Sequence, residues 1–389
     1  MVPPPDSQDP AALAAAAEPV AQTSLRPVQR TAAYAVITNL AGDVLLVRAS
    51  ARSDLRGRWF LPGGGLGHGE HPRDGVLREL GEETGLVAQR ASPRAATADV
   101  VDLAHRGVSL HTLRLIYNVR IADLTPSAAA AVSRPEALLR PEPDGTSDLA
   151  RFVRRDELAE LPLMPFVAEL LGLPAPEPLR PSPPDRPEPL GLEGEAEARL
   201  VDPVLGPTDA PGLHDVEVVD RPNAAETPIR VQRPAAYAVL IDETPGRRKG
   251  KRMLLTRLAE GRTPGRKGTW TLPGGGIDHG EHPLVALERE VYEETGLPYT
   301  VGPLLDIGSR RFIGRAPSGR LEDFHGLRLV YAGSVPVDRP PQVIEVGGST
   351  DEAAWIPVGE LGRINSVPAV RESFATWTEY RRVGPTEDR

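Results

Sequence analysis

The sequence predicts an α+β protein built from two copies of one domain, each with a mixed sheet. A chain of 389 residues is long enough for two domains that each bury a core. VQRTAAYAVI from Val28 returns as VQRPAAYAVL from Val231, and LPGGGLGHGEHP from Leu61 returns as LPGGGIDHGEHP from Leu272. This spacing is far too long for a solenoid repeat, so it indicates a tandem duplication of a whole domain.

Composition between and outside the repeats divides the chain into four segments. Residues 1–26 hold an alanine run without a basic lead and do not resemble a secretory signal, so we expect a disordered tail. Residues 173–228 are rich in proline and charge, which favours an extended linker. The alternative for the linker is an ordered arm that packs one repeat on the other. The two domains are then expected at 27–172 and 229–382.

Within each repeat, short apolar runs predict strands. AAYAVI from Ala32 and VLLVRAS from Val44 are such runs, joined by a turn. RLIYNV from Arg114 predicts a further strand, and an amphipathic segment from Arg155 closes the unit. The second repeat follows the same order, which is typical of helices packed against a mixed sheet.

One helix in each repeat has clear limits. Pro72 and Pro283 suit the first helical turn, where a missing N–H group costs little. Gly85 and Gly296 follow at positions where a helix commonly ends in a left-handed residue. The pattern therefore predicts helices over 72–84 and 283–295.

These helices concentrate negative charge. Glu79, Glu82 and Glu83 share an arc of about 100° on the helix surface, where like charges repel. Arg78 can offset Glu82 one turn earlier. The second repeat carries the same set: Arg289, Glu290, Glu293 and Glu294.

Two interpretations of the glutamates remain open at this point: a solvated acidic face, or a site for a divalent cation. Oxygen ligands alone favour Mg²⁺ or Mn²⁺, and the preceding glycines allow backbone to approach a metal or phosphate closely. The chain has no cysteine, which excludes thiolate metal sites and cysteine nucleophiles.

The full motif resembles a known signature. Gly64, Glu70 and the run RELGEETGL from Arg78 follow the spacing of the Nudix box, GX5EX7REUXEEXGU, and Gly275, Glu281 and EVYEETGL after Arg289 match it equally. Two complete boxes make the solvated-face interpretation unattractive. The resemblance covers both repeats, and its specificity lies in the boxes.

The resemblance implies an α/β/α sandwich in each repeat and hydrolysis of a nucleoside diphosphate linked to another moiety. It further implies Mg²⁺, with Mn²⁺ as the alternative. The implied metal ligands are Glu79, Glu82, Glu83, Glu290, Glu293 and Glu294, with backbone carbonyls at Gly63 or Gly64 and at Gly274 or Gly275. The general base would be one of Glu79, Glu83, Glu290 and Glu294. Glu70 would pair with Arg78, and Glu281 with Arg289, to hold the loop in shape.

The expected partner is a small nucleotide-type molecule, because a formal charge of −9 argues against a general nucleic-acid or membrane binder. We expect a cytoplasmic protein; its oligomeric state and leaving group stay open. A Nudix-type sensor without turnover is the main alternative. Isopentenyl diphosphate isomerase shares the fold but relies on a catalytic cysteine, which this chain lacks.

Several weaker signals complete the analysis. We expect Trp59 and Trp270 in the core, and His68 and His279 in hydrogen bonds of the glycine-rich loop. An acid from a later loop could add a ligand or base; the candidates are Asp148, Asp351 and Glu352. Aromatic residues could stack on a base; the candidates are Tyr34, Tyr237, Phe312 and Phe324. Basic loops near 246–252 and 261–268 could attract polyphosphate. Helix glycines Gly75 and Gly81 predict a weaker first site.

Overall fold

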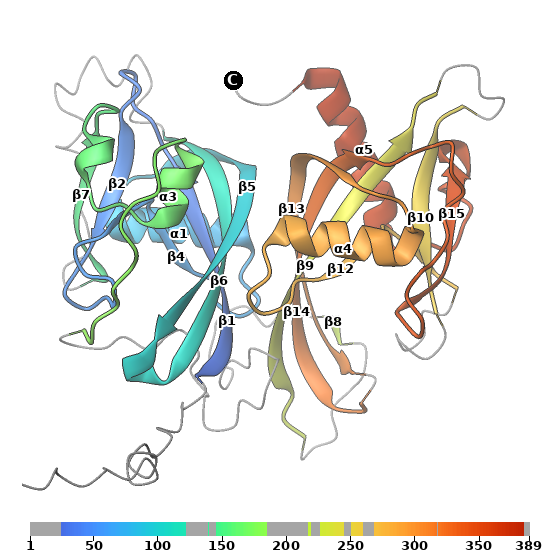
Figure 1. Ribbon diagram of the computed structural model, residues 1–389, viewed down its shortest axis with the longest axis horizontal. Helices are drawn as coiled ribbons and strands as arrows, with labels where there is room; N and C mark the ends of the chain where they lie inside the picture. The colour runs from blue at the N-terminus through green and yellow to red at the C-terminus, as the bar shows by residue number, and fades with distance from the viewer. Residues whose placement is uncertain are drawn as a thin grey trace, which may run out of the picture.

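The computed structural model describes residues 25–121, 139, 145–184, 217–218, 226–244, 250–259, 268–316 and 318–384. The two repeats form two α+β units that lie side by side (Figure 1). The predicted tail, most of the linker and most of both basic loops fall outside the described residues. The domain limits and the disorder of the tail therefore stay predictions.

The first unit has a four-stranded sheet in the order β4-β1-β6-β5 and a three-stranded sheet in the order β3-β2-β7. Strand β1 runs parallel to β6 and antiparallel to β4, so the sheet is mixed, as predicted. The strands are β1 (Arg26–Val36), β2 (Val44–Ala49), β3 (Trp59–Phe60), β4 (Gly63–Gly65), β5 (Ala88–Leu103), β6 (Val108–Ile121) and β7 (Ser147–Val153). The helices are α1 (Pro72–Thr84) and α3 (Pro165–Leu170).

The second unit repeats this plan, with its strands joined into one eight-stranded sheet. Strand β9 pairs parallel with β14 and antiparallel with β12 and β10. The strands are β8 (Glu217–Val218), β9 (Ile229–Asp242), β10 (Arg252–Leu258), β11 (Trp270–Thr271), β12 (Gly274–Gly276), β13 (Thr300–Arg315), β14 (Leu321–Ser334) and β15 (Thr350–Pro357). The helices are α4 (Pro283–Thr295) and α5 (Pro368–Val383).

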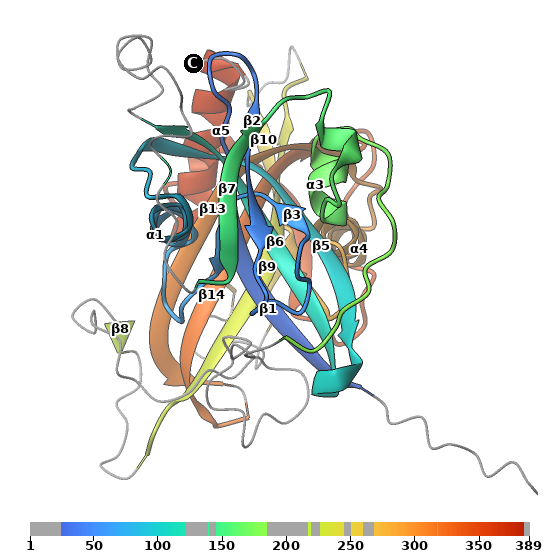
Figure 2. The ribbon, with the colours of Figure 1, turned by 90° about the vertical axis from the view of Figure 1, so that its left-hand side faces the viewer.

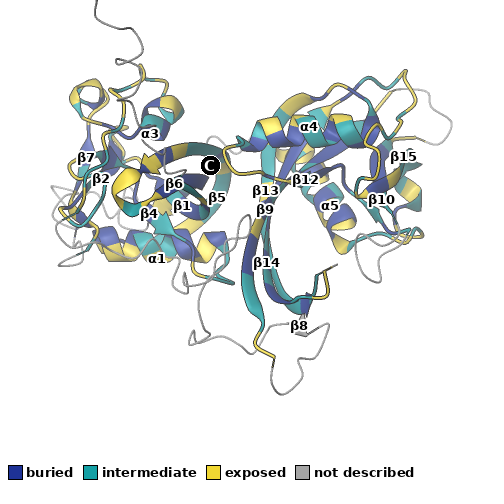
Figure 3. Cartoon of the chain, turned by 60° about the horizontal axis from the view of Figure 1, so that its bottom comes forward, coloured by how far each residue is buried: buried dark blue, intermediate teal, exposed yellow. Residues whose placement is uncertain are grey.

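Each unit is a sandwich, with helices on both faces of its strands. In the first unit α1 and α3 lie on opposite sides of the strands (Figure 2). Val76 and Leu80 of α1 are fully buried in one apolar cluster, and Phe166 and Val167 of α3 belong to another. Figure 3 shows both buried and exposed residues along α4, whose buried Ala286, Leu287 and Val291 belong to the same apolar cluster as Val76 and Leu80. The expected α/β/α sandwich is confirmed.

The predicted limits of the box helices are confirmed. Helix α1 begins at Pro72 and is followed by Gly85 in the left-handed region at φ 72°. The capping residue was not predicted: the Nδ1 atom of His71 accepts a hydrogen bond from the backbone N–H of Arg73 at 3.1 Å. His282 caps α4 in the same way. A histidine is not a standard capping residue, so sequence patterns give little signal for it.

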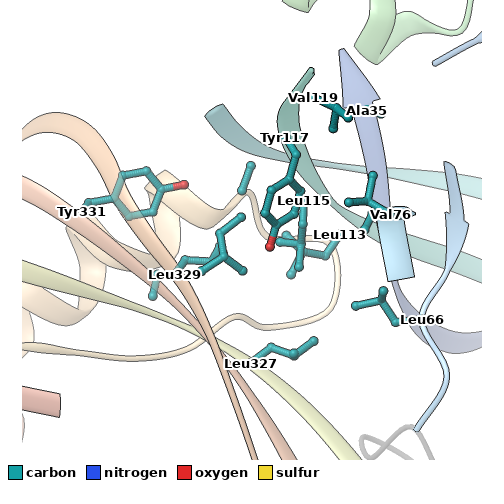
Figure 4. Close-up of a cluster of buried hydrophobic side chains, with 14 of the residues drawn as sticks. Ala35, Leu66, Val76, Leu113, Leu115, Tyr117, Val119, Leu327, Leu329 and Tyr331 are labelled. Carbon is teal, nitrogen blue, oxygen red and sulfur yellow. The ribbon is translucent and has the colours of Figure 1, made fainter. Parts of the chain in front are cut away.

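The two units share an apolar interface. Buried side chains of β6 and β14 belong to one continuous cluster (Figure 4): Leu113, Leu115, Tyr117, Leu327, Leu329 and Tyr331. Burial of such side chains contributes on the order of 1.5–3 kcal/mol each. The two units therefore stabilise one another.

The glycine-rich loop of each repeat contacts the other repeat. His68 Nε2 lies 3.2 Å from a carboxylate oxygen of Asp323, and the His68 and His325 rings are 5.6 Å apart. Reciprocally, His279 Nε2 donates to the backbone carbonyl of Ser109 at 3.0 Å. The sequence predicts that these two histidines form hydrogen bonds within the glycine-rich loop. Their contacts instead join the two repeats.

Candidate active site

An arginine organises each box. The Arg78 guanidinium donates two hydrogen bonds to the Glu70 carboxylate, at 2.8 and 3.0 Å, and one to the carbonyl of Gly65 at 3.1 Å. These bonds join the helix to the glycine-rich loop. Arg78 also reaches Glu79 at 2.9 Å and Glu82 at 3.0 Å. One cation thus offsets part of the repulsion among the glutamates.

The last glutamate of each box is buried. Only 7% of Glu83 and 2% of Glu294 is exposed. Burial raises the pKa of each carboxyl to about 8, although hydrogen bonds oppose the shift. The backbone N–H of Gly63 donates to Glu83 at 2.8 Å, and that of Gly274 donates to Glu294 at 3.0 Å. Each buried carboxylate therefore fixes the start of the glycine strand beside it.

The first glutamate lies against the middle glycine. A Cβ atom at Gly64 would stand 2.5 Å from the Glu79 carboxylate, and one at Gly275 would stand 2.5 Å from that of Glu290. Only a residue without a side chain leaves room for the carboxylate here. Burial raises the pKa of Glu79, while the Arg78 charge lowers it. A bound cation would stabilise the charged carboxylate and so offset the cost of its burial.

The second box repeats the first almost contact for contact. Arg289 donates to both oxygens of Glu281 at 2.9 Å, to Glu290 at 2.8 Å and to Glu293 at 3.3 Å. It also donates to the carbonyl of Gly276 at 3.2 Å. Two sequences that differ outside the motif reach the same geometry, so the motif itself sets the geometry.

The carboxylates do not converge on a single point. Across the described parts of the chain, no group of three or more His, Asp or Glu side chains forms a metal cluster as it stands. The reason is that Arg78 and Arg289 hold the first two glutamates of each box. The donor set nevertheless fits Mg²⁺, because it consists of oxygen atoms around a desolvated carboxylate beside bare glycine backbone.

The later-loop acids do not join the box. Asp148 on β7 pairs with Arg48 at 2.8 Å, while Asp351 and Glu352 on β15 pair with Arg257 at 2.8 and 2.7 Å. Between 41% and 44% of each of these side chains is exposed. The residue beside Asp148 contacts the box instead: the Ser147 hydroxyl donates to Glu83. In the second repeat Thr256 donates to Glu294 at 3.3 Å.

Trp59 lies in the core, as expected, whereas Trp270 is only partly buried. Trp59 is 6% exposed and belongs to the cluster under α3. The Arg151 guanidinium lies 5.1 Å from its ring centroid. Trp270 packs against the equivalent cluster under α5.

A cavity of about 840 Å³ adjoins the second box. Its wall includes Gly275 and Glu294 of the box and, further along, Phe312, Phe324 and Arg328. This volume is within the range of about 300–1,000 Å³ that small-molecule sites occupy. The box and an aromatic, cationic chamber therefore open into one space.

The sandwich and the carboxylate helix held to a glycine-rich loop by an arginine define one class of α+β domain, which is present twice in this chain. A family model, described as NUDIX domain, matches residues 28–171 and 231–377, which is well over half of the chain. The chain therefore belongs to the NUDIX family, with two domains in tandem.

Curated relatives resemble parts of the chain. An RNA pyrophosphohydrolase of Mesorhizobium japonicum is 61% identical over 107 residues, which is 24% of this chain and 58% of that protein. A putative 8-oxo-dGTP diphosphatase 3 of Mycobacterium tuberculosis is 34% identical over 129 residues, covering 32% of this chain and 50% of that protein. The chain thus spans little more than half the length of these relatives.

Solved structures resemble part of the chain. A MutT protein from Methanosarcina mazei is 22% identical, with a TM-score of 0.30, over 40% of this chain and 98% of that one. The NUDIX domain of Shewanella oneidensis NrtR, solved with ADP ribose, is 17% identical, with a TM-score of 0.31, over 39% of this chain and 89% of that one. Among the described residues, no helix has the length and hydropathy needed to cross a bilayer.

Proposed function

We propose that this protein hydrolyses the diphosphate linkage of a nucleoside diphosphate derivative in the presence of Mg²⁺. The observation that carries the proposal is the paired geometry of the boxes, in which buried glutamates face bare glycine backbone in both repeats. The resemblance to two curated relatives, an RNA pyrophosphohydrolase and a putative 8-oxo-dGTP diphosphatase, supports the reaction class. We further expect the protein to act in the cytoplasm.

The residues of each box have different roles, and the first is to hold the metal. Glu79, Glu82 and Glu83, with Glu290, Glu293 and Glu294, would hold the metal with backbone carbonyls at Gly63 or Gly64 and at Gly274 or Gly275. Bound Mg²⁺ would neutralise diphosphate charge and lower the pKa of a coordinated water.

Side chains of the protein would supply the general base and keep the site in position. A carboxylate with a raised pKa, as burial gives Glu83 and Glu294, is suited to accept a proton near neutral pH. Glu79 and Glu290 are the other candidates for the base. Arg78 and Arg289 keep the helix and the glycine strand in register.

The test is a broad panel of nucleoside diphosphate derivatives with purified protein and Mg²⁺: oxidised nucleotides, ADP-ribose, dinucleoside polyphosphates and nucleotide sugars. We expect cleavage of at least one compound at the diphosphate. Replacing Glu79 and Glu290 together with Gln should abolish it. The fold should persist, because glutamine keeps the shape of glutamate. Full turnover by a folded double variant would refute the proposal.

A further inference from the structure

The two repeats differ where a substrate base would lie. On the sheet face that α5 covers in the second unit, Phe312 and Phe324 line the cavity with ring centroids 5.1 Å apart. The cross-strand register places Val101 and Leu110 at the equivalent positions of β5 and β6 in the first unit. An aromatic pair in one repeat is therefore an aliphatic pair in the other.

The charges at this face differ as well. In the first unit Asp99 pairs with Arg114 at 2.6 Å, and only 5% of the Arg114 side chain is exposed. The equivalent residues of the second unit are Arg310 and Arg328, both in the cavity wall. About a third of the Arg328 side chain, 32%, is exposed. The Arg114–Asp99 ion pair is thus replaced by two arginines that line a cavity, of which Arg328 lies 3.9 Å from Glu372 in the same wall.

The helix that packs on this face, α3 in the first unit and α5 in the second, differs in side-chain size at its second residue. Phe166, the second residue of α3, is 3% exposed and lies 5.0 Å from the Tyr34 ring, with the Arg114 guanidinium 4.6 Å from its centroid. The second residue of α5 is Ala369, which lines the cavity together with Tyr237, the counterpart of Tyr34. The Phe166 side chain thus occupies the position in the first repeat that Ala369, with its smaller side chain, leaves open to the cavity in the second.

The segment after α3 closes the first unit further. Leu179 packs against the apolar cluster that contains Val101 and Leu110. The carbonyl of Pro178 accepts a hydrogen bond from Arg58 at 3.2 Å, and the backbone N–H of Ser182 donates to the carbonyl of Asp54 at 3.0 Å. The described start of the linker therefore lies across the face whose counterpart is the cavity.

We propose that the second repeat binds the base of the substrate, stacked on the Phe312–Phe324 pair, and that the first repeat's equivalent chamber is closed by Phe166 and Leu179. The ligand is an aromatic base that carries a polyphosphate. The base meets the ring faces, while Arg310 and Arg328 attract the anionic group. The cavity continues to Glu294, so base and diphosphate occupy one space. The proposal rests on the proposed function for its substrate class.

The test is calorimetric titration of the full chain with ADP, GDP, CDP and UDP in EDTA, so that binding is measured without turnover. Inorganic pyrophosphate is the probe that lacks a base. We expect at least one nucleoside diphosphate to bind about tenfold more tightly than pyrophosphate, with one site per chain. Binding of none of the four, or two equal sites, would overturn the proposal.

Matched substitutions locate the site. Phe324→Leu installs the residue that the first repeat carries, and it should weaken nucleoside diphosphate binding about tenfold. Phe324→Trp should retain binding. Ala369→Phe should block the chamber, whereas Phe166→Leu in the first repeat should leave binding unchanged. Wild-type affinity in Ala369→Phe and Phe324→Leu, with circular dichroism unchanged, would refute the assignment. Binding with this pattern but no hydrolysis would refute the proposed function alone.

Discussion

The packing of glutamate against glycine in the second box yields a sharp prediction. Gly275→Ala would place a Cβ atom 2.5 Å from the Glu290 carboxyl carbon. Ordinary contacts of this kind begin at about 3.4 Å, so the carboxylate must retreat by roughly 1 Å, and a displacement of that size can lower turnover about 100-fold. The neighbouring Gly276→Ala is the matched control, because nothing lies within 4 Å of its added methyl group.

The assay is kcat/KM on whichever compound the substrate panel identifies, together with calorimetric titration of Mn²⁺. We expect Gly275→Ala to lose about 100-fold in kcat/KM and to bind Mn²⁺ more weakly. Gly276→Ala should stay within about twofold of wild type, since ordinary surface changes have small effects. Equal activity of the two variants would show that the carboxylate does not depend on the bare backbone.

Three further predictions follow from the structure. Burial lowers the pKa of His325 to about 3. As the pH falls, the unfolded chain therefore protonates His325 at a higher pH than the folded chain does. The free energy of unfolding should therefore fall as pH drops below about 6.5, by about 1.4 kcal/mol per pH unit; urea titration should show a shallower fall in His325→Asn. Gly81→Ala should raise stability by about 1 kcal/mol, because its methyl group meets nothing within 4 Å, whereas Gly75→Ala should lower it, because a Cβ there lies 2.4 Å from Leu66; thermal denaturation that ranks them oppositely would refute this. Limited proteolysis should cut first between about 185 and 228, as Pro-rich linkers predict, and early cuts inside a repeat would contradict the domain limits.

The sequence was sufficient for the parts of the fold that local chemistry determines. Pro72 and Gly85 mark a helix because their backbone preferences suit only its ends, and the helix spans the residues expected. The duplication predicted two like units. The register of the glutamates on the helix also follows from spacing alone. These features require no knowledge of distant contacts.

Contacts between residues far apart in the sequence could not be predicted from local patterns. The contacts of His68 and His279 with the other repeat depend on how the two units pack, which no local pattern encodes. The helix glycines illustrate the same limit: Gly75 is required by the close approach of Leu66, so it is not simply a weak point of α1. Phe166 and Ala369 could have been compared once the repeats were aligned, but their meaning depends on the cavity.

The most direct measurement compares two equivalent substitutions on the same substrate, Glu83→Gln in the first box and Glu294→Gln in the second. Because the base-binding chamber is assigned to the second repeat, we expect Glu294→Gln to lose about 100-fold or more in kcat/KM, the scale on which a positioned acid or base contributes. Glu83→Gln should retain most of the wild-type value. A greater loss in Glu83→Gln than in Glu294→Gln would contradict the account.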